Sequence, residues 1–232
     1  MQTIPMNIAE NFQMLSRRVE RAAQRAGHPV RLLAASKSQP AAAIAALAAL
    51  GQRAFGENYV QEALAKQGEL RAELRDMTLE WHAIGPLQSN KAHDVATNFG
   101  WLHSVDRLKL VPALDRHRPA SMAPLQVLIQ VNIDDETSKS GCPPAQIAEL
   151  AAAIAASPRL ALRGLMAIPA PADADRRRAA FARMHDLFAE LKSGHAAADT
   201  LSMGMSDDFE LAIEQGANLV RIGSALFGPR HG

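Results

Sequence analysis

The chain has 232 residues, 48% of them apolar, which suits one large hydrophobic core in a single domain spanning residues 1–232. Its 25 Lys and Arg residues balance 24 Asp and Glu, giving a formal charge of +1 that argues against a nucleic-acid or membrane-surface partner and favours a small molecule. The single cysteine and the lack of a signal-like start or bilayer-length apolar run predict a cytoplasmic protein.

An amphipathic helix is predicted at the start, from about residue 8 to residue 26. Its apolar residues at helical spacing are Ile8, Phe12, Leu15 and Val19, with arginines between them. Gly27 follows as a typical C-terminal stop. We therefore expect residues 1–28 to form a leading helix packed on the rest of the domain.

Eight short apolar runs follow, and they alternate with stretches rich in helix formers. In chain order the runs are RLLAASK, RAFGENY, LEWHAIG, WLHSVD, LQVLIQVNI, LALRGLMAI, TLSMG and LVRIGS. Strands that alternate with helices pair in parallel, and eight such units predict a single closed (β/α)8 barrel of the TIM type. An open doubly wound sheet is the alternative, although it usually has fewer strands.

Several polar residues follow these runs, at the strand ends where barrels carry their chemistry. Lys37 ends the first run, and its amine would lie at the mouth of the barrel. The residues at the other strand ends are Glu57 and Asn58, His82 and Gly85, Ser104 and Asp106, Asn132, Met203 and Gly204, and Gly223 and Ser224. We expect them to converge on one mouth.

The last two units suggest a phosphate cradle. In LSMGMSDDFELAI, Gly204 permits a tight turn and Ser206 stands where the N-cap of the next helix would be. In LVRIGSALFG, Gly223 and Ser224 would add backbone N–H groups and a hydroxyl. Phosphate sites in barrels commonly use these two loops. The acidic pair at 207–208 suits a helix N-terminus but opposes strong binding of a free phosphate.

A lysine, a phosphate cradle and an arginine together favour pyridoxal phosphate as the ligand. Its aldehyde needs an amine to form a Schiff base, its phosphate needs N–H donors, and its ring nitrogen needs a partner. Arg221, just before the cradle, would be that partner. Two adjacent positive charges repel, so the ring nitrogen would stay unprotonated, and the cofactor would be a weak electron sink.

Long motifs along the chain resemble the pyridoxal phosphate homeostasis protein family. They are FGENYVQE at 55–62, WHAIGPLQSNK at 81–91, HSVD at 103–106, VLIQVNIDDETSKSG at 127–141, RGLMAI at 163–168, LSMGMSDDFELAI and VRIGSALFG. The resemblance implies a barrel similar to the N-terminal domain of bacterial alanine racemase. It also implies a protein that binds and buffers pyridoxal phosphate, influences vitamin B6 and amino-acid pools, and has no established catalytic turnover.

The resemblance also assigns roles to individual residues. It implies a Schiff base on Lys37, ring contacts near Asn58 and His82, phosphate contacts from Ser206, Gly223 and Ser224 with backbone help from Gly204 and Met205, and Arg221 at the ring nitrogen. Each residue also has a structural interpretation: Lys37 as a solvated strand cap, Arg221 as the partner of a carboxylate, and His82 as a satisfied core histidine. The acidic run at 134–136 is expected to be a solvated loop.

Two functions follow from these residues. The first is a binding protein that holds pyridoxal phosphate and delivers it to, or withholds it from, pyridoxal-phosphate-dependent apo-enzymes. The alternative is a racemase-like enzyme, which requires a second acid or base on the opposite face of the cofactor. Tyr59, the only tyrosine, lies in the second unit and does not fit that role by position. We expect a monomer, with a weak dimer as the alternative.

Overall fold

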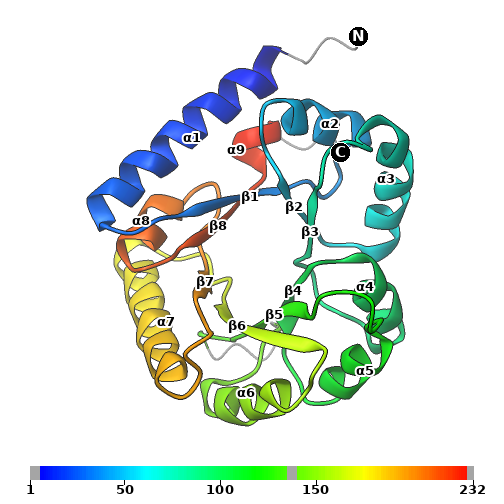
Figure 1. Ribbon diagram of the computed structural model, residues 1–232. Coiled ribbons are helices and arrows are strands. Elements are labelled where there is room, and N and C mark those ends of the chain that lie inside the picture. Colours follow the sequence, from blue (N-terminus) through cyan, green and yellow to red (C-terminus); the bar gives the residue numbers. More distant parts are fainter. Residues whose placement is uncertain (1–5, 135–139, 229–232) are drawn as a thin grey trace.

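The computed structural model describes residues 6–134 and 140–228. Eight parallel strands close into a barrel in sequence order, and the last pairs with the first (Figure 1). They are β1 (Arg31–Ala35), β2 (Ala54–Glu57), β3 (Glu80–Ala83), β4 (Trp101–Val105), β5 (Leu125–Gln130), β6 (Leu160–Met166), β7 (Thr200–Ser202) and β8 (Leu219–Ile222). The predicted (β/α)8 barrel is confirmed, with each strand inside one of the eight predicted runs.

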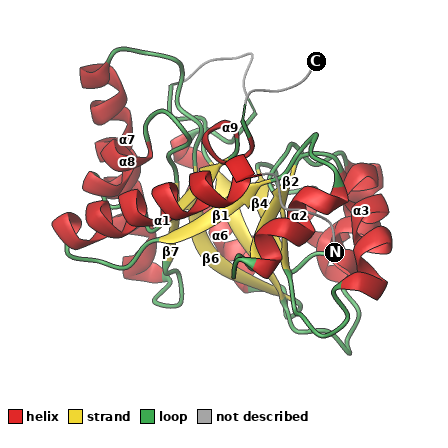
Figure 2. Ribbon diagram, turned by 90° about the horizontal axis from the view of Figure 1, so that it is seen from above, coloured by secondary structure: helices red, strands yellow, loops and turns green. Residues whose placement is uncertain are grey.

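Helices surround the strands, as Figure 2 shows. They are α1 (Met6–Ala26), α2 (Ala41–Ala49), α3 (Val60–Glu73), α4 (Ala92–Asn98), α5 (Leu110–His117), α6 (Ile147–Ala155), α7 (Ala174–Gly194), α8 (Phe209–Glu214) and α9 (Ser224–Phe227), with 3-10 turns at Ser89–Lys91 and Pro144–Gln146. Within the described residues, no helix has the length and apolar character needed to span a bilayer.

The leading helix α1 lies outside the ring of barrel helices, against α8 and α9 (Figure 1). Its buried face is formed by Leu15, Val19 and Ala22, which join a hydrophobic cluster with residues of α2, β8 and α8. This apolar stripe is the one that the helical spacing in the sequence predicted. The helix therefore covers the segments that follow β7 and β8 and form part of the barrel mouth.

The start of α8 differs from the sequence prediction. The helix begins at Phe209, and Asp208 rather than Ser206 precedes it. The Asp208 carboxylate accepts a hydrogen bond from the Met205 N–H at 2.7 Å, which closes the turn before the helix. Ser206 is thereby left outside the helix, and its hydroxyl accepts a hydrogen bond from the Ala225 N–H of α9 at 3.2 Å.

The acidic run at 134–136, which was expected to be a solvated loop, is only partly described by the structure. Residues 135 and 136 lie outside the described part of the chain. The Asp134 carboxylate accepts a hydrogen bond from the Ala170 N–H at 2.6 Å. The first residue of the run thus contacts the segment after β6.

Candidate cofactor site at the barrel mouth

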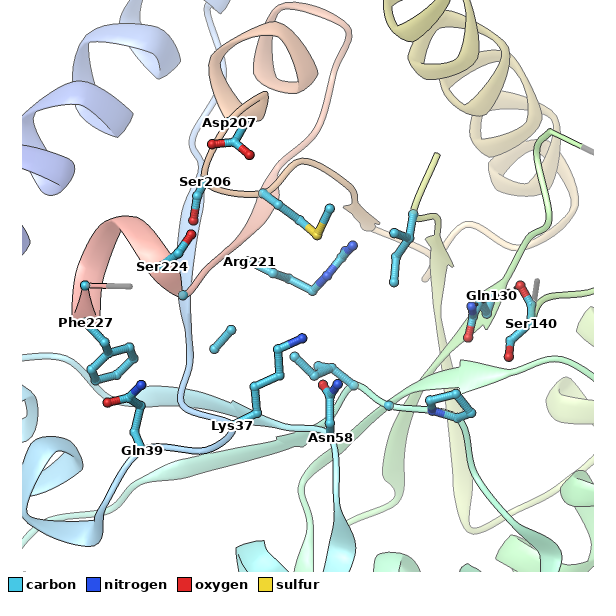
Figure 3. A pocket seen from close by; sticks show the side chains of 18 residues that line it. Lys37, Gln39, Asn58, Gln130, Ser140, Ser206, Asp207, Arg221, Ser224 and Phe227 are labelled. Atoms are coloured by element: carbon cyan, nitrogen blue, oxygen red, sulfur yellow. Dashed lines mark hydrogen bonds between the residues drawn. The ribbon is translucent and has the colours of Figure 1, made fainter. Parts of the chain in front are cut away.

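A cavity of about 440 Å³ opens at the carboxyl ends of the strands, a volume typical of small-molecule sites. Seven of the nine residues expected at the site line it: Lys37, Asn58, Met205, Ser206, Arg221, Gly223 and Ser224. Figure 3 shows the Lys37 and Arg221 side chains extending into the same space, Lys37 from the segment after β1 and Arg221 from the neighbouring strand β8. The structure therefore brings the amine, the guanidinium and the serine cradle into one pocket.

Lys37 lies in a short segment after β1 that is attached to β2 and α3. The Ser36 hydroxyl donates to the Glu57 carboxylate at 2.6 Å, and the Ser36 N–H donates to the Gly56 carbonyl at 2.9 Å. From α3, the Lys66 ammonium donates to the Ser36 carbonyl at 2.8 Å and to Glu57 at 2.8 Å. A buried polar network thus fixes the backbone immediately before Lys37.

The residue after Lys37 has a constrained conformation. Ser38 has a positive φ of 60°, which is uncommon for a residue other than glycine. Its N–H donates to the Glu62 carboxylate at 2.6 Å, and Glu62 also pairs with Lys66 at 2.6 Å. Such a conformation persists only where the surroundings hold it. The α3 side chains therefore determine where the Lys37 backbone lies.

Arg221 is buried at the base of the cavity and is neutralised by no described carboxylate within ion-pair distance. Its guanidinium donates to the Ser202 carbonyl at 2.9 Å, to the Ser202 hydroxyl at 2.7 Å and to the Ala167 carbonyl at 3.0 Å. Burial lowers the pKa of Arg221 to about 10, so the side chain stays charged at neutral pH. A buried cation held by neutral oxygens is a strong donor to an electron-rich ligand atom.

The cradle lies on the opposite side of the cavity from Gln130 and Ser140. Figure 3 shows the Ser206 and Ser224 hydroxyls facing one another, with Asp207 beside them. Gly223 lies close to β1, since a Cβ built there would be 3.1 Å from the Ala35 carbonyl oxygen. Two hydroxyls at a backbone turn form a group that can donate to an anion.

Two expected residues do not line the cavity. His82 is fully buried inside the barrel, where Nε2 lies 2.7 Å from the Glu80 carboxylate and Nδ1 lies 2.8 Å from Nε2 of His103. His82 is not among the residues that line the cavity, and its contacts match the core-histidine interpretation. Gly204 adopts the tight turn expected of it, with φ of 91°, and its carbonyl accepts from the Arg221 N–H.

Other strand-end residues also have structural roles. Glu57 supports the Lys37 segment, and the Ser104 hydroxyl donates to the Gly85 carbonyl at 2.7 Å. Asp106, Asn132 and Met203 are likewise not among the residues that line the cavity. The residues that line the cavity but were not predicted from the sequence are Ala35, Gln39, Ile84, Pro86, Gln130, Ser140, Ile168, Phe227 and Gly228. Gln130 lies two positions before Asn132, which was selected from the sequence. Residues two apart on a strand face the same side, and this spacing is the only sequence signal that could have indicated Gln130.

The chain matches a family model described as alanine racemase, N-terminal domain, over residues 11–231. It is 54% identical over 227 residues to the pyridoxal phosphate homeostasis protein of Pseudomonas aeruginosa, covering 96% of each chain. It is 52% identical over 228 residues to the protein of the same name from Escherichia coli K12, covering 97% of each.

Solved structures agree with this relationship. PipY of Synechococcus elongatus PCC7942, with pyridoxal phosphate bound, has a TM-score of 0.81 and 37% identity, over 95% of this chain and 100% of that one. Alanine racemase from Corynebacterium glutamicum shares the fold, with a TM-score of 0.67 and 23% identity over 97% of this chain and 63% of that one. The chain therefore belongs to the pyridoxal phosphate homeostasis protein family.

Proposed function

We propose that this protein binds pyridoxal 5'-phosphate at the barrel mouth as a Schiff base on Lys37 and thereby serves vitamin B6 and amino-acid homeostasis. The observation that carries the proposal is the meeting of Lys37, Arg221 and the Ser206–Ser224 cradle in one cavity of about 440 Å³. These groups match the three functional parts of the cofactor. The relatives named as homeostasis proteins, and PipY with its bound cofactor, support the same ligand.

The residues present fit the cofactor chemically. The Lys37 amine would hold the aldehyde of the cofactor through a reversible covalent bond, formed with loss of one water. The Ser206 and Ser224 hydroxyls and the Gly223 backbone would contribute donors for the phosphate. The Met205 N–H, also expected there, already donates to the Asp208 carboxylate. Asn58, which reaches the cavity beside Lys37 in Figure 3, would contact the ring. Arg221 would donate to the ring nitrogen.

The cofactor is held for supply rather than for a reaction cycle. A reversible bond to one lysine allows release when free cofactor falls, and apo-enzymes that depend on pyridoxal phosphate are the recipients. Arg221 opposes protonation of the ring nitrogen, which weakens the cofactor as an electron sink. We place the protein in the cytoplasm and expect a monomer.

The test is the visible spectrum of the protein with pyridoxal phosphate, before and after borohydride, followed by peptide mapping. We expect a band that borohydride converts into a stable adduct on Lys37. Lys37→Ala should lose the band and keep the fold, whereas Lys109→Ala, an exposed lysine in the segment before α5, should keep both. Adducts spread over surface lysines would contradict the assignment.

The cradle has a separate test. Ser206→Ala and Ser224→Ala each remove one hydroxyl donor, so we expect affinity to fall by about 1 kcal/mol per serine. Titration of the apo-protein with pyridoxal, which has no phosphate, is the control. Its affinity should be nearly the same in the wild type and in both variants, and an equal loss for both ligands would place the phosphate elsewhere.

A further inference from the structure

A chain of buried polar side chains runs through the barrel interior, from the cavity to the opposite end. It begins at Arg221 and ends at Glu80, the first residue of β3. Glu80 is only partly buried and forms an ion pair with Arg31, the first residue of β1. The chain therefore connects the candidate cofactor site with a carboxylate at the amino ends of the strands.

Four contacts make up the chain. The Arg221 guanidinium donates to the Ser202 hydroxyl at 2.7 Å, and that oxygen lies 3.4 Å from Nδ1 of His103. Nε2 of His103 lies 2.8 Å from Nδ1 of His82, and Nε2 of His82 lies 2.7 Å from the Glu80 carboxylate. Ser202, His103 and His82 have no exposed surface.

The two ends of the chain leave only one direction for the hydrogen bonds. Arg221 can only donate, and the ionised Glu80 carboxylate can only accept. Burial raises the pKa of the Glu80 carboxyl, but its hydrogen bonds to His82 and Arg31 and the positive charge of Arg31 outweigh that effect and hold the pKa below its ordinary value. Burial lowers the pKa of both His82 and His103, so each imidazole is neutral and carries one proton.

The position of each imidazole proton follows from this direction. His82 must carry its proton on Nε2, because Glu80 accepts there, and Nδ1 of His82 is then an acceptor. His103 must therefore also carry its proton on Nε2, which leaves its Nδ1 to accept from the Ser202 hydroxyl. The Ser202 oxygen, whose proton is directed to His103, accepts from Arg221. Every member of the chain donates toward Glu80.

We propose that Glu80, His82, His103 and Ser202 are positioning residues that hold the Arg221 guanidinium in one orientation toward the cavity. Three of its five N–H groups donate to oxygens of Ser202 and Ala167. This leaves two N–H groups of a side chain that lines the cavity, and these can donate to a ligand acceptor. This inference rests on the proposed function, since it describes how the partner of the ring nitrogen is held.

The surroundings of the two imidazoles strengthen this arrangement. The charged groups that face them are Glu80 of β3, Arg31 of β1 and Arg221 of β8. The His82 ring stacks on Trp101 of β4, with centroids 5.2 Å apart and an interplanar angle of 11°. Hydrogen bonds in such a dry interior polarise one another, so loss of the terminal charge weakens the whole chain.

The first experiment measures the imidazole protons in the apo-protein by 15N NMR. We expect His82 and His103 to be neutral at pH 7 with the proton on Nε2 in both rings. A proton on Nδ1 of either ring, or a charged imidazolium, would overturn the proposal. This measurement does not depend on pyridoxal phosphate, so it remains decisive if the proposed function fails.

The second experiment breaks the chain at its far end, with Glu80→Gln. We expect the dissociation constant for pyridoxal phosphate to rise roughly 3- to 10-fold, as for coupling through a packed network. The control is Asp199→Asn. Asp199 also pairs with an arginine, Arg163, whose guanidinium lies over the Trp101 ring, but Asp199 does not belong to the chain of buried polar side chains. The control should change the constant less than about twofold.

A double-mutant cycle shows whether Glu80 acts through the chain. In a Ser202→Ala background, where the link to Arg221 is already cut, Glu80→Gln should have no further effect on affinity. An equal loss in both backgrounds, or a loss equal to that of Asp199→Asn, would overturn the proposal. If the wild type formed no borohydride-fixed adduct on Lys37, the proposed function would fail, while the imidazole spectra would still test the chain.

Discussion

Replacing Lys66 by methionine tests how the segment that carries Lys37 is held. The Lys66 side chain is 7% exposed, and its ammonium contacts Glu57 at 2.8 Å and Glu62 at 2.6 Å. It also donates to the Ser36 carbonyl at 2.8 Å. Methionine has a similar length and removes all three contacts. The substitution therefore leaves the Glu57 carboxyl, whose side chain is 1% exposed, without its cation.

The expected loss of stability depends on pH. Removing one partner of a buried pair costs about 3–5 kcal/mol, unless the other partner becomes neutral. Burial raises the pKa of Glu57 above 4.5, and the hydrogen bond from Lys66 lowers it, so the variant should have a still higher pKa. The folded variant then binds more protons than the unfolded chain above pH 4.5, and its stability falls as pH rises, by at most about 1.4 kcal/mol per pH unit.

Urea unfolding, followed by tryptophan fluorescence, measures this effect. We expect Lys66→Met to lose about 3 kcal/mol near pH 7.5 and clearly less near pH 5.5. Adding Glu57→Gln should remove most of the pH dependence. Lys192→Met, on the exposed face of α7, should change stability by less than about 0.5 kcal/mol. A loss below about 1 kcal/mol, or an equal loss at both pH values, would refute a charged, buried Lys66–Glu57 pair.

Three further predictions concern the barrel core. Gly164→Ala should lower the free energy of unfolding, measured in urea, by more than about 3 kcal/mol. Gly164 has a φ of 141°, and a Cβ there would lie 1.9 Å from the Thr200 carbonyl oxygen, so an unchanged unfolding midpoint would contradict this close approach. Cys142 is buried with its pKa raised to about 12, so a thiol reagent should label it only after unfolding. The lowered pKa values of His82 and His103 should make stability fall as pH decreases below about 6.5, where the unfolded histidines bind protons first; constant stability down to pH 5.5 would contradict this.

The barrel could be predicted from sequence because its strands are buried on both faces. Parallel strands covered by helices appear as short continuous apolar runs, and all five residues of β4 are buried. The mouth follows from topology, since the carboxyl ends of all strands share one end of the barrel. Lys37, Asn58, Arg221 and Ser224 were therefore accessible to reasoning from position alone.

His82 and Lys66 show where such reasoning ends. Glu80 and His82 are two residues apart on one strand and therefore share the interior face. The sequence does not show, however, that the His82 side chain contacts Glu80 rather than the cavity, because this depends on how the barrel closes. Lys66 has the sequence context of an exposed helical lysine, and its burial depends on Ser36 and Glu57 from two other elements. Contacts between residues far apart in the sequence determine the environment of both side chains.

Under the proposed assignment of the site residues, the site geometry favours binding over racemisation. A two-base racemase needs an acid or base on each face of the cofactor. In the proposed site Lys37 would supply one. Tyr59, the only tyrosine in the chain, is 65% exposed and is not among the residues that line the cavity. If Arg221 is the partner of the ring nitrogen, as proposed, it would keep that nitrogen unprotonated and disfavour the carbanion that racemisation requires. Interconversion of alanine or serine enantiomers by the wild type, lost in Lys37→Ala, would show that another residue serves as the second base and that the protein is an enzyme.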